Sequence, residues 1–424
     1  MVAEGYKRTE VGVIPEDWKI VFLKDVVVQN GLVRGPFGGA LKKEYFVKNG
    51  YKVYEQRNAI YADINIGNYF VDQNKFDELK RFEIQENDFI VSCSGTIGRI
   101  HRIPKNSPKG IINQALLKIT IDTNKIESDY FLTIFRWDKF QAKIIDSTQG
   151  GAMKNLVGMD IFKNTPIQIP IIKEQKAIAT ALSDVDELIA SLESLITKKE
   201  NIKTAAMQQL LTGKKRLDGF SGEWVEKKLG DIVEFKKGKG LPKSALAESG
   251  LYRCIHYGEL FTVYKESIST VKSSTNDNQE CVYSKVNDVL MPTSDVTPNG
   301  LATASCINEN GIILGGDILI IRAYPNILNG VFLSYYISVN KEKVMKLVSG
   351  STVYHLYGSD MANLELNIPP VEEQTAIANI LFDMDSDIKA LKTKLVKTKA
   401  IKTGMMQELL TGKTRLSFTR ESND

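Results

Sequence analysis

The stretch IPIIKEQKAIATALSDVDELIASLESLITKKENIKTAAMQQLLTGKKRL, residues 169–217, occurs twice in this chain. The second copy, IPPVEEQTAIANILFDMDSDIKALKTKLVKTKAIKTGMMQELLTGKTRL, covers residues 368–416 at an offset of 199 residues, and about half of the aligned positions are identical. Shared helical composition alone does not explain this identity, so we infer a tandem duplication. The repeat extends weakly upstream, where Trp18, Leu23 and Asp25 align with Trp224, Leu229 and Asp231.

Each copy carries the start and stop signals of a long helix. Pro170 and Pro369 precede acidic first turns, which suit the positive end of a helix dipole. Gly213 and Gly412 follow the last apolar residues, and glycine there supplies the left-handed conformation that ends many helices. We therefore expect one long helix in each copy.

Apolar residues within both copies recur at alternating steps of four and three residues. These residues are Ile178, Leu182, Val185, Ile189, Leu192 and Ile196 in the first copy, and Ile377, Leu381, Met384, Ile388, Leu391 and Leu395 in the second. The spacing is typical of a coiled-coil seam, in which one stripe is buried against a partner helix. At about 1.5 Å per residue, some 38 residues span roughly 57 Å, too long to lie on one domain of this size.

We therefore expect the two helices to pack on each other, antiparallel. The alternative is an amphipathic helix that packs on its own domain. The apolar pattern weakens at Lys199 and Thr398 and resumes out of step at Ile202 and Ile401, which predicts a stutter in the seam.

The regions outside the long helices mix predicted strands with shorter helices. FIVSCS and ALLKITI in the first region, and DVLMPTS and GDILIIRAY in the second, predict strands, and helical patterns surround residues 128–144 and 330–347. The predicted fold class is α+β, with two mixed α/β domains separated by two long antiparallel helices that form a coiled coil, related by an internal pseudo-two-fold repeat. The predicted boundaries are a first domain at 1–168, a first spacer helix at 169–213, a second domain at 214–367, a second spacer helix at 368–416 and a tail at 417–424.

Composition excludes several classes of protein. The 424 residues are 43% hydrophobic and 25% charged, so disorder is not the overall state, and the net charge of +4 permits a polyanionic partner without demanding one. Four cysteines without a C-x-x-C pair and only three histidines fit neither a zinc cluster nor a disulfide framework. The N-terminus lacks the apolar segment of a signal peptide and no run of 18 apolar residues occurs, so we expect a soluble, cytoplasmic protein without a membrane partner.

Basic residues gather at glycine-rich breaks, where main-chain NH groups and long cations can approach phosphates closely. Candidate DNA-binding residues of this kind are Arg34, Lys42 and Lys43 in the first region and Lys236, Lys237, Lys239 and Lys243 in the second. The S-G-T-I-G segment contributes Ser94 and Thr96, and the second basic strip, which follows it, contributes Arg99 and Arg102. The alternative interpretation of all these charges is a solvated surface.

Two short clusters have side chains able to contact base edges. They are Gln56, Arg57 and Asn58 in the first region and Arg253 and His256 in the second. Catalytic motifs are missing, since the chain has no G-x-x-x-x-G-K-[ST], no H-E-x-x-H and no G-x-G-x-x-G between a strand and a helix. We therefore predict no catalytic residue and no metal site in this chain.

The whole chain resembles the specificity subunit of type I restriction-modification systems. The residues that carry the resemblance are P-x-x-x-E-Q-x-x-I at 170–178 and 369–377, L-L-T-G-K at 210–214 and 409–413, the openings IPEDW at 14–18 and GEW at 222–224, and GPFGGALKKEYFVKNGY near the start. In one respect the second region departs from the pattern, because DVTPNG at 295–300 replaces the shorter S-G-T-I-G loop. Equal DNA contacts in the two halves are therefore not expected.

The resemblance implies a DNA-recognition subunit without a catalytic site. Two target recognition domains would each recognise one half of an asymmetric, gapped sequence in double-stranded DNA, and the helices would set the gap. Two modification subunits would dock on the chain and methylate adenine N6, and restriction subunits would translocate and cleave DNA. S-adenosylmethionine, ATP and magnesium would then be bound by the partner subunits, with no cofactor on this chain.

Two other hypotheses remain open from the sequence. The chain could be an assembly protein, a spacer of two-fold symmetry that organises enzymes without recognising DNA. It could also hold a cryptic nuclease or methyltransferase centre, which would show as activity of the isolated chain.

Overall fold

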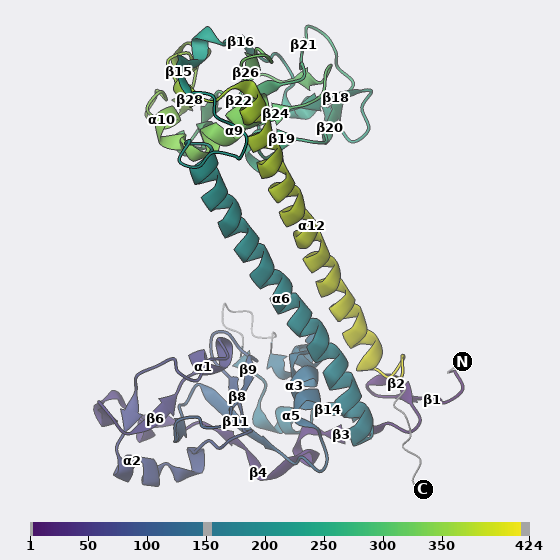
Figure 1. Cartoon of the computed structure of the whole chain (residues 1–424). Helices are drawn as coiled ribbons and strands as arrows, with labels where there is room; N and C mark the ends of the chain where they lie inside the picture. Colours follow the sequence, from purple (N-terminus) through teal and green to yellow (C-terminus); the bar gives the residue numbers. More distant parts are fainter. Residues whose placement is uncertain (1–2, 147–154, 417–424) are drawn as a thin grey trace. The chain divides into compact units, whose positions relative to one another are not determined.

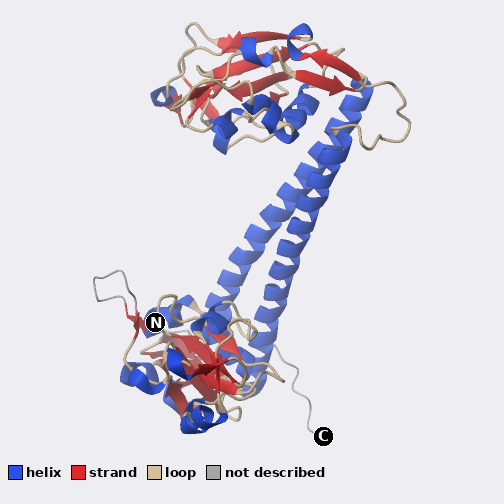
Figure 2. Ribbon diagram, turned by 90° about the vertical axis from the view of Figure 1, so that its left-hand side faces the viewer, coloured by secondary structure: helices blue, strands red, loops and turns tan. Residues whose placement is uncertain are grey.

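The computed structural model of the chain describes residues 3–146 and 155–416 (Figure 1), so the predicted tail at 417–424 lies outside the described residues. The chain divides into two compact units, one formed by residues 1–191 with 395–424 and the other by residues 192–394. Two uninterrupted helices, α6 (Ile172–Leu210) and α12 (Val371–Leu409), each contribute residues to both units. Figure 2 shows that the strands of each unit lie together among short helices, whereas α6 and α12 are long and continuous.

The globular part of unit 1 contains two main sheets. One has the strand order β4 (Val27–Arg34), β11 (Leu116–Ile121), β8 (Phe89–Ser92), β9 (Ile100–Arg102), and the other the order β10 (Gly110–Ile112), β6 (Tyr51–Tyr54), β7 (Phe70–Val71), β5 (Phe46–Val47). Strand pairs β1 (Tyr6–Thr9) with β2 (Gly12–Pro15), β3 (Lys19–Phe22) with β14 (Pro166–Ile169), and β12 (Ile145–Asp146) with β13 (Asn155–Leu156) complete the pairing. The helices are α1 (Gln56–Ile60), α2 (Gln73–Glu78), α3 (Ser128–Arg136), α4 (Asp138–Ile144) and α5 (Met159–Lys163).

Unit 2 repeats the strand order of the two main sheets and adds one strand at an end of each. Its first sheet has the order β16 (Val233–Lys237), β26 (Ile318–Ala323), β22 (Asp288–Pro292), β24 (Ser305–Ile307), β19 (Ser267–Ile268), and its second the order β17 (Leu246–Ala247), β20 (Ser273–Thr275), β18 (Tyr252–Ile255), β25 (Ile313–Leu314), β21 (Val282–Tyr283). The remaining pairs are β15 (Val225–Lys228) with β28 (Glu365–Ile368) and β23 (Ser294–Asp295) with β27 (Tyr354–His355). The helices are α7 (Glu259–Thr262), α8 (Pro298–Leu301), α9 (Gly330–Val339), α10 (Lys341–Met345) and α11 (Gly358–Met361).

The duplication therefore extends through the globular domains and not only through the long helices. The strand orders β4-β11-β8-β9 and β16-β26-β22-β24 correspond, as do β5-β7-β6-β10 and β17-β20-β18-β25. Matching turns enter β8 and β22, because Asn87 and Asn287 both have positive φ, and the main-chain NH groups of Gln85 and Lys285 donate to the carboxylates of Asp88 and Asp288. The strands predicted from the four apolar runs are confirmed as β8, β11, β22 and β26.

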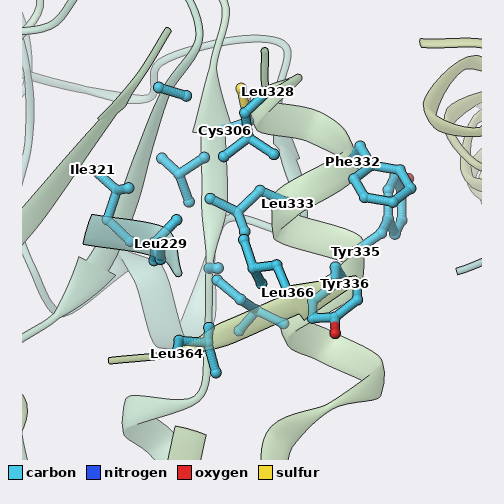
Figure 3. Packing of buried hydrophobic residues seen from close by; sticks show 14 of the residues in the cluster. Leu229, Cys306, Ile321, Leu328, Phe332, Leu333, Tyr335, Tyr336, Leu364 and Leu366 are labelled. Carbon is cyan, nitrogen blue, oxygen red and sulfur yellow. The ribbon is translucent and has the colours of Figure 1, made fainter. Parts of the chain in front are cut away.

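The predicted shorter helices are present, but each is divided in two. Residues 128–144 form α3 and α4, and residues 330–347 form α9 and α10. In unit 2, Leu333 of α9 packs with Leu229, Ile321 and Leu366 in the core (Figure 3). Burial of each such side chain stabilises the fold by roughly 1.5–3 kcal/mol relative to leaving it exposed.

The repeated E-Q pair at the start of each long helix anchors that helix to its own domain. The amide of Gln175 accepts a hydrogen bond from the NH of Glu127 at 2.7 Å and donates to the carbonyl of Pro170 at 2.9 Å. Gln374 likewise accepts from the NH of Asn329 at 2.9 Å and donates to the carbonyl of Pro369 at 2.8 Å. Because both amides are buried, replacing either one would leave main-chain groups without partners.

A repeated arginine follows the end of each long helix. It pairs with the buried glutamate of the E-Q motif at the start of the other long helix. Arg415 holds Glu174 with bonds of 2.6 and 2.8 Å, and it also contacts Asp17 at 2.8 and 2.9 Å. Arg216 holds Glu373 in the same way. Each of these pairs joins the start of one long helix to the segment that follows the other. The predicted glycine stops are confirmed, since Gly213 and Gly412 both have φ of +70°.

The seam between the long helices is antiparallel within each unit. In unit 1, Ile178 and Leu182 near the start of α6 share a core with Leu409 and Leu410 at the end of α12. Unit 2 shows the reverse arrangement, with the end of α6 packed in a core with Ile377 and Leu381. All twelve predicted seam residues are buried or half-buried, whereas apolar residues off the seam, such as Leu188 and Val396, are exposed.

The predicted stutter in the seam is wrong. Ile202 and Ile401 are 47% and 58% exposed, so the seam does not shift to them. It continues in step through Thr398, which is buried, and through lysines whose ammonium groups reach carboxylates of the other helix. Lysine can occupy such positions because its aliphatic stem is buried while its charged end reaches the edge of the interface.

Removing Asp385 tests the polar layer of the seam in unit 2. Asp385 accepts bonds from Lys203 at 2.6 Å and from the Tyr335 hydroxyl at 2.5 Å, and the Lys203 side chain is only 15% exposed. We expect Asp385→Ala to lower the free energy of unfolding by about 2 kcal/mol, because a largely buried ammonium and a phenol lose their partner. Urea unfolding measures this loss. Asp387→Ala is the control, since its pair with Lys199 is exposed and should contribute less than about 0.5 kcal/mol. Equal losses for the two variants would contradict the account.

Candidate nucleic-acid interface

The glycine-rich loop after β4 depends on a close approach between main chains. The NH of Gly35 donates to the carbonyl of Leu116 at 2.9 Å, and a Cβ at Gly35 would lie 1.9 Å from the carbonyl oxygen of Asn113. Gly38 has a positive φ of +63°. Lys42 and Lys43, which follow this turn, are exposed, and Lys42 contacts Glu44 at 3.5 Å. The loop therefore presents two cations from a turn that glycine makes possible.

Unit 2 builds the equivalent loop after β16 by the same means. A Cβ at Gly238 would lie 2.0 Å from the carbonyl oxygen of Gly315, and the NH of Gly238 donates to Ile318 at 2.9 Å. Lys237 and Lys239 are exposed, whereas Lys236 is half-buried. Their contacts with carboxylates are Lys236–Glu234 at 3.1 Å, Lys237–Asp317 at 3.5 Å and Lys239–Glu280 at 2.5 Å. Solvated pairs of this kind contribute little, so a phosphate could replace the carboxylate at small cost. Lys243 is also exposed, at the start of the next turn.

Substitution of Gly35 tests this close approach. We expect Gly35→Ala to destabilise the protein by about 1–3 kcal/mol, because the added methyl group would collide with a main-chain oxygen that cannot move freely. Gly404→Ala is a control of opposite sign, since a Cβ there meets nothing within 4 Å and alanine favours the helix by about 1 kcal/mol. Thermal unfolding of the full chain measures both effects. A neutral Gly35→Ala variant would show that the loop relaxes easily.

The predicted base-contacting cluster at 56–58 is only partly accessible. Asn58 is fully buried, and its amide accepts from the NH of Glu55 and donates to the carbonyls of Asp63 and Ile66, each at 2.8 Å. Its hydrogen-bonding groups therefore hold the loop that follows α1. Gln56 is half-buried, and Arg57 is exposed, with its guanidinium 3.1 Å from the Glu55 carboxylate. Arg57 is thus the member of this cluster that best fits a contact with DNA.

The S-G-T-I-G segment forms a tight turn between β8 and β9. The Ser92 hydroxyl donates to the carbonyl of Thr96 at 2.6 Å and accepts from the NH of Arg99 at 3.0 Å. Ser94, Thr96 and Arg99 are exposed on this turn. Arg102 is half-buried in β9 and pairs with Asp129 of α3 at 2.8 Å, so it has an intramolecular partner.

The predicted candidate Arg34, at the end of β4, is half-buried beside Cys93 rather than fully exposed. Burial raises the pKa of the Cys93 thiol to about 11.

The second predicted cluster is not positionally equivalent to the first. Arg253 lies within β18 and pairs with the Glu309 carboxylate, one contact being 2.8 Å, whereas Gln56–Asn58 follow β6. His256 is half-buried, and its Nδ1 accepts from the NH of Gly258 at 3.2 Å. The 295–300 insertion forms β23 and α8 in place of the tight turn, so the two units do differ there.

The residues next to the glycine loop of unit 1 are not among the candidates that the sequence predicts. Asn113 and Gln114 follow β10 and, with Lys43, Phe46, Glu55 and Tyr69, line a cleft of about 250 Å³. A polar pair directly after a strand was the available signal, but only the long-range pairing of β6 and β10 brings it to the cleft.

Nowhere in the described part of the chain do three or more His, Cys, Asp or Glu side chains gather as a metal site requires. None of the helices in residues 3–146 and 155–416 has the length and hydropathy of a membrane-spanning segment.

The chain belongs to a class of proteins that carry two similar globular modules on one chain. Each module is a mixed α/β domain, and it is followed by a long helix that packs antiparallel on the helix of the other copy. The family described as "Type I restriction modification DNA specificity domain" matches residues 15–203 and again residues 221–398. The chain belongs to this family and contains its domain twice. It is accordingly a specificity subunit, the DNA-recognition component of a type I restriction-modification system, and not a catalytic one.

Known relatives match along nearly the entire chain. A putative type I restriction enzyme MjaX specificity subunit of Methanocaldococcus jannaschii is 25% identical over 435 residues, covering 97% of each chain, and the MjaVIII specificity subunit of that organism is 25% identical over 433 residues, covering 97% of this chain and 96% of the relative. The S subunit structure from M. genitalium has a TM-score of 0.56 at 16% identity and covers 95% of this chain and 97% of its own. The HsdS subunit structure from Thermoanaerobacter tengcongensis has a TM-score of 0.53 at 17% identity and covers 98% of this chain and 100% of its own. The structural likeness supports the fold.

Proposed function

We propose that each globular domain of this chain recognises one half of an asymmetric, gapped sequence in double-stranded DNA. The observation that carries the proposal is the shared framework with different surfaces. Both domains present lysines from a glycine-rich turn at the same place in the same topology, yet the side chains around those turns differ. Two domains of common origin that recognised the same half-site would have no need for such differences.

Phosphate contacts would position the DNA, and base contacts would select the sequence. Exposed lysines such as Lys43 and Lys243 suit the DNA backbone because their charge is independent of sequence. Exposed groups with directional hydrogen bonds, such as Arg57, suit base edges. The antiparallel seam, with its polar layer, would fix the number of base pairs between the two half-sites.

We also propose that this chain docks two modification subunits, which would methylate adenine N6, and restriction subunits, which would translocate and cleave DNA. Exposed apolar residues off the seam support docking where they share a helix face, as Leu195 and Ile202 do at a spacing of seven residues, because apolar surface patches mark protein–protein interaction sites. Leu195 and Ile202 of α6 and Ile401 of α12 are 40%, 47% and 58% exposed. S-adenosylmethionine, ATP and magnesium would be bound by those partners. Methylation would require the target adenine to leave the base stack, which a clamp of domains and partners can stabilise.

Selection of duplexes from a random pool by the complex of this chain with its modification subunits tests the proposal. We expect enrichment of one motif with two fixed blocks separated by a spacer of constant length. Affinity for that motif should fall steeply as salt rises, because counterions are released from phosphates. Salt-independent binding without sequence enrichment would favour an assembly protein that does not recognise DNA.

A further inference from the structure

We propose that the cleft of unit 1 beside the glycine-rich loop receives the major-groove edge of a DNA base pair, and that Gln114 is a base-recognising residue of that half-site. The proposal rests on the proposed function and identifies where one half-site is recognised. The lining side chains that carry the argument are Lys43, Phe46, Glu55, Tyr69, Asn113 and Gln114.

Two sets of contacts fix parts of the cleft lining. In the first, Phe46 and Tyr69 stack with ring centroids 4.6 Å apart. In the second, the NH of Asn113 donates to the carbonyl of Tyr54 at 2.9 Å, and its side-chain oxygen accepts from the NH of Ala115 at 3.0 Å. The close approach of Gly35 to Asn113 joins the glycine loop to this turn. The site therefore needs little ordering when a ligand binds.

Gln114 is presented outward by this fixed turn. Its side chain is exposed, whereas the neighbouring Asn113 is half-buried and fixed by the turn. A glutamine amide can donate to N7 and accept from N6 of adenine at the same time, which distinguishes adenine from the other bases. Gln114 is thus placed for a bidentate contact with an A·T base pair.

Charge around the cleft suits DNA. Lys43 is exposed at the rim and can contact a phosphate next to the bound base pair. Glu55 lies mostly covered, with a side chain 17% exposed, and holds the guanidinium of Arg57 at 3.1 Å. The carboxylate therefore orients a second base-contacting group instead of facing the DNA as a free negative charge.

Unit 2 keeps the framework of this cleft and changes its lining. The parallel pairs Tyr54↔Ile112 in unit 1 and Ile255↔Leu314 in unit 2 are equivalent, so Asn113 and Gln114 correspond to Gly315 and Gly316. The same alignment places His256 where unit 1 has Glu55. The positions that support the cleft are similar, because Leu41 and Lys43 correspond to Leu241 and Lys243, each pair at the same turn. A different lining on a shared framework is what two recognisers of different sequences require.

The small volume of the cleft favours a base-pair edge over a small molecule. Its volume of about 250 Å³ lies below the roughly 300–1,000 Å³ of pockets that enclose small molecules. Polar groups at its rim can contact an edge that enters only partly. We therefore assign it to double-stranded DNA.

Mapping of N6-methyladenine in cells that carry the full chain and its modification subunit tests this assignment. We expect Gln114→Ala to relax one A·T position in one block of the motif, with about tenfold lower discrimination there, and to leave the other block unchanged. Gln29→Ala is the matched control, since Gln29 is an exposed glutamine of the same domain outside the cleft, and its motif should equal that of the wild type.

The outcomes separate this proposal from the proposed function. A wild-type motif that stays unchanged in Gln114→Ala would overturn the cleft assignment while leaving the proposed function intact. The absence of any motif with the wild-type chain would instead overturn the proposed function. If Gln114→Ala abolishes methylation, binding of the purified complex decides the matter. Weaker binding to the wild-type motif alone supports the cleft, and equal loss on random duplexes overturns it.

Discussion

Replacing Arg415 by alanine should lower the free energy of unfolding by about 3 kcal/mol, the largest stability effect that we expect from one surface-accessible side chain. Glu174 is 1% exposed and receives two hydrogen bonds from Arg415, so the variant would leave a buried carboxylate with Trp18 Nε1, at 3.3 Å, as its remaining side-chain donor. The value lies at the low end for a broken buried pair because the Arg415 side chain is 36% exposed and water can replace part of it.

Lys413→Ala is the matched control for Arg415→Ala. Lys413 lies two residues earlier, is 66% exposed and contacts Glu408 only at 3.7 Å, so its loss should change the unfolding free energy by less than about 0.5 kcal/mol.

The Arg415 hydrogen bond is also the largest cause that lowers the pKa of Asp17, and Arg415→Ala should return that pKa toward its ordinary value. Asp17 contributes stability above its unfolded-state pKa that is lost as pH falls, so this acid-dependent part should disappear in the variant. Chemical unfolding at several pH values measures both effects, and equal stability of Arg415→Ala and Lys413→Ala would contradict them.

The double substitution Lys42→Ala with Lys43→Ala should weaken binding to every DNA sequence by about tenfold at moderate salt. Both side chains are exposed on the glycine-rich loop. Removing two phosphate contacts should reduce the slope of log affinity against log salt concentration by roughly two.

Arg57→Ala should act differently from the lysine pair, because a base contact contributes only on the correct sequence. For Arg57→Ala we expect about tenfold weaker binding to the selected motif and unchanged binding to random duplexes.

Titrations of the two variants at four salt concentrations, on the selected motif and on a random duplex of equal length, separate these effects. Lys48→Ala is the control for the lysine pair, since Lys48 is also exposed but lies beyond the loop, after β5. Equal losses on both duplexes for Arg57→Ala would show that Arg57 does not discriminate bases. A loss confined to the motif for the lysine pair would show that the loop contacts bases and not phosphates.

The long helices could be predicted in detail because their signals are local. The steps of four and three residues repeat along Ile178–Ile196, and a glycine with positive φ ends each helix, so neither feature depends on distant parts of the chain. The stutter was predicted wrongly for a specific reason. Lys203 and Lys402 do not look like seam residues in a hydrophobic pattern, yet their stems are buried and their charges are paired across the seam.

The candidate site was much less predictable because it depends on long-range pairing. Asn58 looked like a base-contacting residue in the sequence, but its amide is consumed by the loop at Asp63 and Ile66. Gln114 could not be predicted from the sequence, since only the pairing of β10 with β6 places it beside the glycine loop. Residue type indicates which side chains can contact DNA, whereas burial and strand order decide which of them are free to do so.

The most direct test of the central claim is a map of N6-methyladenine on plasmid DNA from cells that carry this chain with the modification subunit of its own genome. Two recognition domains on one chain predict methylation at a single gapped, two-part motif, and omission of this chain should abolish it. Methylation that is absent, or that continues without this chain, would contradict its role as the DNA-recognition subunit.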